Sequence, residues 1–274
     1  DGKNITDVAQ IIKELLKADL DKEFDFGSYI DFKNLTEKQI ENLYKVGKVW
    51  GFLKYYHPVI ANGEYNWDFE LFRVMPKVLA AVNQDQRNTI LYDWTQSLGK
   101  TSPGKVEMNA GKEVKLSPDL AWIDNTVLGE KLTSQLINIK NAERTDTNYY
   151  IDLFRRVRNP IFKNENPYSA MIYPDAGFRI LALFRYWNII QYFFPYKHLI
   201  GEDWNNVLKE FIPLFVNASD ELQYKLASSA LIVRIHDTHA AAWEDNTLSE
   251  YYGHYLSPVK VSFVENKAVV TDYY

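Results

Sequence analysis

The chain has no cysteine among its 274 residues, so disulfide bonds and thiolate metal sites are excluded. It also has no run of eighteen uncharged apolar residues, because the most apolar stretch, 178–194, contains Arg179 and Arg185. We therefore expect no membrane span. Basic residues are not in excess, with 31 Lys and Arg against 36 Asp and Glu and a net charge of -5. A chain without a basic excess is a poor partner for nucleic acid.

The sequence lacks an initiator methionine, since it begins at Asp1. We expect that a leader segment has been removed and that the protein is exported to the periplasm or cell envelope. The absence of cysteine does not decide this point, because it suits a reducing cytosol and a cysteine-poor exported protein equally.

Hydrophobic residues make up 46% of the chain and aromatic residues 15%, which is enough for a buried core. Their spacing predicts a mainly α fold, and the helix over 178–194 is apolar on most of its circumference, so it belongs inside the core. Pro76 lies within a further helical pattern, where we expect a kink or a new first turn. The other ranges with helical spacing are 5–20, 36–56, 68–82, 85–98 and 125–140.

An internal duplication is indicated by residues that match at a constant offset of 137. The chain has only 7 Trp and 10 Pro, so matches of these residue types at one offset favour a duplication over coincidence. We interpret 38–102 and 175–239 as two related helical units. The matched pairs are Trp50 and Trp187, Tyr55 and Tyr192, Pro58 and Pro195, Trp67 and Trp204, and Pro76 and Pro213.

The remaining segments are arranged around these units. Residues 1–37 form an N-terminal helix and lead-in, 103–174 a connecting segment with short strands and a helix, and the second unit extends through its histidine cluster to 256. Residues 257–274 alternate apolar and polar side chains around a turn at Glu265-Asn266, which predicts a β-hairpin. Because a lone hairpin is marginal in water, we expect it to begin a larger sheet.

The two units differ at their ends, and this difference marks the candidate site. The same position carries Ser102 in the first unit and His239 in the second, where His236 and Asp237 complete a polar cluster. One interpretation is a catalytic zinc site in which Asp237 or Glu244 adds an oxygen ligand to the two histidines. The other is that both histidines form hydrogen bonds in a loop that closes the helix. We expect no metal and no cofactor.

Two further features bear on function. None of the serines lies in the Gly-x-Ser-x-Gly elbow of a hydrolase, so we expect no complete hydrolytic site in this chain. Tyr251, Tyr252 and Tyr255 follow the histidine cluster and either line a peptide or glycan groove or cover the last helix.

Several of these segments resemble a known family. They are similar to the region ahead of the catalytic domain in tail-specific, or C-terminal-processing, serine peptidases of the type found in Bacteroidetes. The resemblance covers about 43–274. The segments that carry it are Phe178 to Pro195 with Tyr196-Lys197, then Glu202-Asp203-Trp204, then Asp237-Thr238-His239-Ala240 leading into Pro258-Val-Lys-Val.

The resemblance implies that the hairpin opens a PDZ-like domain, which holds substrate C-termini, and that a downstream α/β domain bears the nucleophilic serine. In the tricorn-like branch of the family a histidine at this position is the general base. This implies that His239 serves a distant serine, with Asp237 and His236 in support. In the Ser-Lys branch the corresponding segment is structural, and both readings stay open.

Our leading hypothesis is therefore the helical N-terminal region of an exported serine peptidase, inactive by itself, that forms one wall of the substrate channel. Its expected partners are a peptide or unfolded-protein substrate and its own downstream PDZ-like and catalytic domains. The alternative is a stand-alone envelope protein that binds peptide or glycan. A third hypothesis is a small metal-dependent hydrolase that uses His236 and His239.

Overall fold

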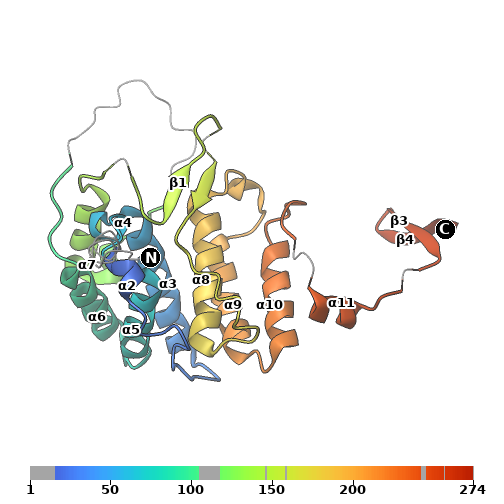
Figure 1. Ribbon diagram of the computed structural model, residues 1–274, viewed down its shortest axis with the longest axis horizontal. Helices are drawn as coiled ribbons and strands as arrows, with labels where there is room; N and C mark the ends of the chain where they lie inside the picture. Colours follow the sequence, from blue (N-terminus) through green and yellow to red (C-terminus); the bar gives the residue numbers. More distant parts are fainter. Residues whose placement is uncertain are drawn as a thin grey trace, which may run out of the picture.

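The computed structural model describes residues 16–104, 118–145, 147–157, 159–241, 245–255 and 257–273. These ranges contain ten α-helices and four strands, so the fold is mainly α, as predicted (Figure 1). The helices are α2 (Lys17–Leu20), α3 (Glu37–Tyr56), α4 (Pro58–Ala61), α5 (Trp67–Leu79), α6 (Gln84–Ser97), α7 (Asn125–Lys140), α8 (Ala176–Phe193), α9 (Trp204–Asn217), α10 (Glu221–Val233) and α11 (Asn246–Tyr252), with a 3-10 helix η1 (Lys197–Leu199). The strands are β1 (Ile151–Leu153), β2 (Pro160–Phe162), β3 (Val259–Val264) and β4 (Lys267–Tyr273).

The helices lie side by side in one body. Figure 1 shows them in order from α7 and α6 at one end, through α3 and α8 in the middle, to α9 and α10 at the other end. A single hydrophobic core runs through these helices and includes residues from α3, α5, α8 and α9. None of the described helices is both long and apolar enough to cross a membrane.

The central pair, α3 and α8, is formed by strong local signals and a close contact. Thr36 begins α3 with a capping box, because its side chain accepts from the Gln39 amide and Gln39 reaches back to the Thr36 amide. Asp175 caps α8 by accepting from the Phe178 amide at 3.1 Å. The helices approach closely because α3 carries glycine where α8 presents side chains: a methyl group at residue 47 would meet the Phe184 ring, and one at residue 51 would overlap the Asn188 side chain.

A reciprocal tryptophan pair joins each central helix to the helix that follows it. Trp50 Nε1 donates to the Trp67 carbonyl at 2.8 Å, and Trp67 Nε1 donates to the Trp50 carbonyl at 2.9 Å. The same exchange joins Trp187 and Trp204, at 2.7 and 3.0 Å. All four rings are buried, so these bonds satisfy the only polar atom of each indole inside the core.

The new first turn that we considered at Pro76 is not found. α5 is continuous through Pro76 to Leu79, and α9 likewise continues through Pro213. The neighbours Met75 and Val78 are buried, so core packing outweighs the one backbone hydrogen bond that proline cannot donate.

The strands form two separate antiparallel pairs. β1 pairs with β2 from Ile151 opposite Phe162 to Leu153 opposite Pro160. β3 pairs with β4 around Glu265 and Asn266, whose φ angles of 50° and 60° suit a two-residue hairpin turn, so the predicted hairpin is confirmed.

The other predicted helices are found within one or two residues of their expected bounds, and α7 matches the predicted range 125–140. The helix expected over 5–20 falls mainly outside the described residues, which include only its last part as α2.

The contact between α3 and α8 generates a stability prediction. Gly51→Ala should lower the free energy of unfolding by about 1–3 kcal/mol, because the added methyl group meets the buried Asn188 amide. Urea unfolding followed by tryptophan fluorescence would measure this loss. Adding Asn188→Ala should recover part of it, whereas losses that simply add would show that the two side chains do not interact.

Candidate functional site

The histidine cluster lies in the loop that follows α10. His236 has a φ of 52°, in the left-handed region, and its amide donates to the Val233 carbonyl at 3.1 Å. Gly99, which lies 137 residues earlier at the end of α6, has a φ of 92°. A left-handed residue commonly ends a helix, so His236 occupies a helix-ending position that glycine fills in the first half of the chain.

An arginine clamp fixes the start of this loop against α9. Arg234 Nε donates to Glu202 Oε1 at 2.6 Å, a second guanidinium nitrogen bonds the other oxygen of Glu202, and Nη1 donates to Glu210 at 2.9 Å. The bidentate contact lowers the pKa of Glu202. Sequence analysis missed this clamp, because nothing local to residues 202 or 234 pairs two positions so far apart.

Asp237 and His239 form a dyad within the loop. The Asp237 carboxylate accepts from the His239 amide at 2.9 Å and lies 3.0 Å from His239 Nδ1. Both contacts lower the pKa of Asp237, which keeps it charged beside the imidazole. The His239 side chain is 95% exposed, so its Nε2 side is open to an approaching group. The turn places the two side chains together as the sequence could only allow, since on a helix they would not face each other.

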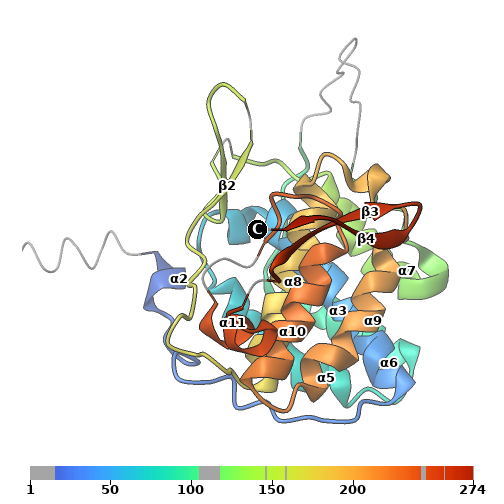
Figure 2. The same ribbon diagram turned by 90° about the vertical axis from the view of Figure 1, so that its right-hand side faces the viewer.

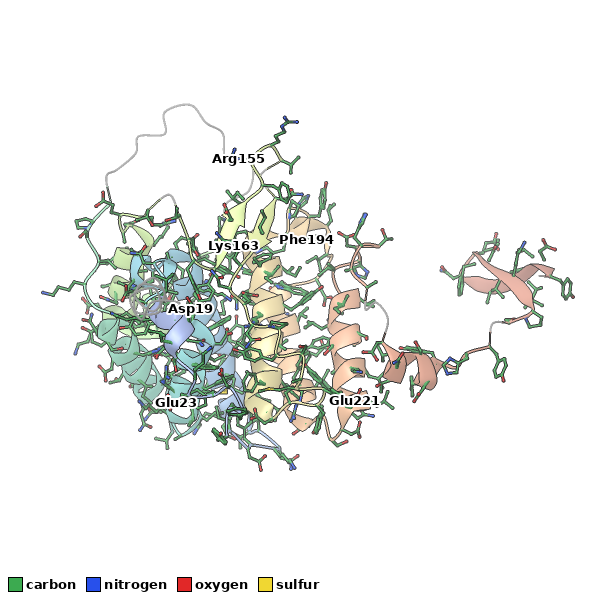
Figure 3. All side chains as sticks on the ribbon, in the orientation of Figure 1. Asp19, Glu23, Arg155, Lys163, Phe194 and Glu221 are labelled. Carbon is green, nitrogen blue, oxygen red and sulfur yellow. The ribbon has the colours of Figure 1, made fainter. Side chains whose placement is uncertain are left out.

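The three candidate tyrosines lie away from this dyad. The start of α11 is tied to the start of α10, because Lys225 bonds Asp245 and Thr247 donates to Glu221. Figure 3 labels Glu221 at the lower end of α10, whereas the dyad follows the far end of this helix, about 20 Å away for thirteen residues. Tyr251, Tyr252 and Tyr255 are 56%, 71% and 98% exposed, so they do not cover the last helix.

A metal site is not assembled among the described residues, where no three His, Cys, Asp or Glu side chains come together to hold an ion. Glu244, which we considered as a ligand, lies outside those residues.

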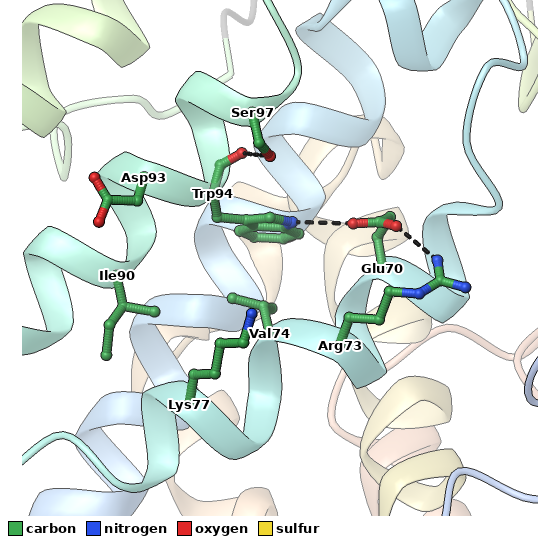
Figure 4. A pocket seen from close by; sticks show the side chains of 8 residues that line it. All are labelled: Glu70, Arg73, Val74, Lys77, Ile90, Asp93, Trp94 and Ser97. Atoms are coloured by element: carbon green, nitrogen blue, oxygen red, sulfur yellow. Dashed lines mark hydrogen bonds and ion pairs between the residues drawn. The ribbon is translucent and has the colours of Figure 1, made fainter.

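A surface pocket of about 370 Å³ lies between α5 and α6 (Figure 4). Its polar groups already have partners: Glu70 accepts from Arg73 at 2.6 Å and from Trp94 Nε1 at 3.4 Å, and Ser97 donates to the Trp94 carbonyl. Trp94 is 8% exposed and stacks on Trp67, so it offers no open ring to a sugar. The pocket is therefore a weaker candidate than the loop.

Sequence analysis also missed a buried ionic network between the two halves of the chain. Lys54 is fully buried and pairs with Glu165, and Arg185 pairs with Asp68. Tyr168 donates to Asp68 at 3.1 Å. Because every charge has a partner and the network reaches into the connecting segment, it holds this segment against α3 and α8.

Two buried bases have strongly shifted pKa values in the same region. Burial lowers the pKa of Lys48 to about 7, and its partners are the uncharged Asn205 at 2.7 Å and Tyr44 at 3.1 Å. Burial lowers the pKa of His57 to about 4, and His57 Nε2 has no hydrogen-bond partner in the described structure. Both lie inside the helical body, so they concern stability rather than the exposed loop.

Comparison of the chain with protein-family models, with curated proteins and with solved structures finds no match. The argument for function therefore depends on the site itself.

His57 gives a prediction for pH. Its folded pKa of about 4 lies below its ordinary value of 6.5, so the unfolded chain takes up the proton first as the pH falls. The free energy of unfolding should fall by about 1–3 kcal/mol between pH 6.5 and pH 4, and level off for this group below that range.

The test is urea unfolding at pH 7.5 and pH 5 of the unchanged chain and of His57→Asn. Asparagine keeps an acceptor for the Val59 amide, which His57 Nδ1 now fills at 3.3 Å, but it does not titrate. The variant should lose less stability between the two pH values. An equal loss in both chains would contradict the assignment.

Proposed function

We propose that this chain is the helical N-terminal region of an exported, tail-specific serine peptidase, and that His239 is the general base for a serine on another domain. The chain by itself is inactive in this proposal. Peptides or unfolded proteins are the substrates, and the helical body forms one wall of their channel.

The geometry of Asp237 and His239 is the observation that carries this proposal. A carboxylate at His239 Nδ1 orients the ring and stabilises its charged form, while Nε2 is left free to take a proton from a hydroxyl. Two members of a triad are thus present in contact, and the open side of the ring leaves room for the third. A purely structural histidine would gain nothing from 95% exposure.

The proposed duplication is supported by contacts that recur between positions 137 residues apart. Residues at matching positions touch: residue 47 faces Phe184, residue 51 faces Asn188, and the Tyr55 and Tyr192 rings lie 5.3 Å apart. Other contacts are exchanged between the halves. The pairs are Lys48 with Asn205 and Arg185 with Asp68, and Glu41 with Lys209 and Phe178 with Phe72. Reciprocal contacts of this kind are typical of two related units about a twofold axis.

The hairpin supports the proposed PDZ-like domain. β3 and β4 expose large apolar side chains, with Phe263 81% and Val270 53% exposed. A two-stranded sheet with such a surface needs further strands or a cover to be stable.

The decisive experiment uses the longer product that contains the serine domain. His239→Ala should lower kcat/KM for peptide hydrolysis by about 10²–10⁴-fold, because the serine loses its base, and Asp237→Asn should lower it less. His236→Asn is the matched control, since asparagine tolerates the left-handed backbone and should leave activity unchanged.

Full activity in His239→Ala would overturn the general-base role. The size of the protein in its source cells tests the larger proposal: an antibody raised against this 32.0 kDa chain should detect a band well above that mass. A band at 32 kDa would leave no room for a serine domain.

A second candidate is a stand-alone envelope protein that binds peptide or glycan. The exposure of Tyr251, Tyr252 and Tyr255 favours it, since aromatic rings open to solvent can stack on a ligand. Binding of peptides or glycans that is lost in Tyr251→Ala and Tyr252→Ala, by a protein of 32 kDa in the cell, would select this candidate.

A further inference from the structure

The outer surface of α10 carries an apolar stripe. Leu222, Leu226, Ala230 and Val233 follow one another at helical spacing along this helix. Val233 is 65% exposed, Ala230 is exposed, and both leucines are half-buried. Leu214 of α9, 47% exposed, extends the stripe sideways. We call these five residues the α10 stripe.

The corresponding surface of α6 shows that the fold does not require this stripe. The positions 137 residues earlier on α6 are polar and exposed, and the position that corresponds to Leu214 is a lysine. The corresponding residues are Lys77, Asp85, Thr89, Asp93 and Gln96. α6 and α10 begin at corresponding residues, Gln84 and Glu221, so the comparison is residue by residue. Five polar side chains in one half thus stand against five apolar ones in the other, which points to a docking surface.

The α10 stripe adjoins a hollow and an interface that already exists. A groove of about 390 Å³ between α9 and α10 is lined by Pro213, Leu214, Leu226, Ala227 and Ala230. The first turn of α10 is covered by α11 through the bonds from Lys225 to Asp245 and from Thr247 to Glu221. The uncovered stripe therefore continues a contact that the chain itself makes.

The segment after α11 has an apolar face that needs such a surface. Val261 lies opposite Val270 and Phe263 lies opposite Ala268, so these four side chains share one face of the hairpin. Val261 is 48% exposed and Phe263 81% exposed. Only residues 253–258 separate α11 from β3, a tether of about 20 Å at full extension, and about 20 Å is also the length of α10. Figure 2 shows the hairpin on the side of the body where α9 and α10 lie.

We propose that the α10 stripe is the seat of the sheet that β3 and β4 begin, with the hairpin's apolar face turned onto α9 and α10. This inference rests on the proposed function, because it gives the PDZ-like domain its position. Docking there would place that domain beside the loop of Asp237 and His239, which leaves the end of α10.

The absence of native cysteine allows a direct test in this chain by paired cysteine substitution. Leu214→Cys with Ala268→Cys reports on the stripe. Lys77→Cys with Ala268→Cys is the matched control, at the corresponding position of the first half. A short bismaleimide should link the first pair within one molecule at least ten-fold faster than the control pair. Equal rates would overturn the proposal.

A second variant separates docking from chance proximity along the tether. Leu226→Thr, Ala230→Asp and Val233→Gln together give α10 the surface residues of α6, which shows that a helix in this environment accepts them. Linking should fall to the control rate while the urea midpoint of the helical body stays within error. Unchanged linking would overturn the proposal, and so would linked dimers whose yield rises with concentration, because a second copy would then occupy the stripe.

The outcomes distinguish this inference from the proposed function. An active longer product with His239→Ala inactive, but without preferential linking, would overturn the inference alone. Preferential linking in this chain together with an inactive longer product would overturn the peptidase alone.

Discussion

The close approach of α3 and α8 is the contact on which the rest of the structure depends. Glycines at residues 47 and 51 remove side chains from one helix, and Phe184 and Asn188 fill the space from the other. Because the two backbones lie so near, polar groups along the contact lose water and must find partners across it. The core is thereby built around one seam instead of two separate halves.

The charges along this seam are arranged to meet that demand. Lys54 with Glu165 and Arg185 with Asp68 pair across elements that are distant in sequence. Removing one member of such a pair is costly, whereas the intact pair adds little net stability, so the network's main effect is to fix which surfaces meet. It also holds the connecting segment in place, and with it the path of the chain into α8.

The two halves of the chain share a scaffold and differ in what they present. Reciprocal tryptophan pairs, helices that begin at corresponding residues and left-handed helix ends recur in both. The differences are at the far end of the second half, where a helix end becomes the loop of Asp237 and His239 and the polar surface of α6 becomes the apolar stripe of α10. Function on this scaffold is therefore expected at the α10 end, where the chain passes to its hairpin.

The sequence by itself determined the helices, their caps and the final hairpin, because these follow from apolar periodicity, from Thr36 and Asp175, and from the turn at Glu265-Asn266. It also located the loop of Asp237 and His239. Only the tertiary structure decided that the two side chains touch, that α5 continues through Pro76, and that Arg234 clamps Glu202. Local patterns depend on neighbours a few residues away, whereas burial and ion pairing depend on which distant surfaces meet, and that is fixed only when the helices assemble.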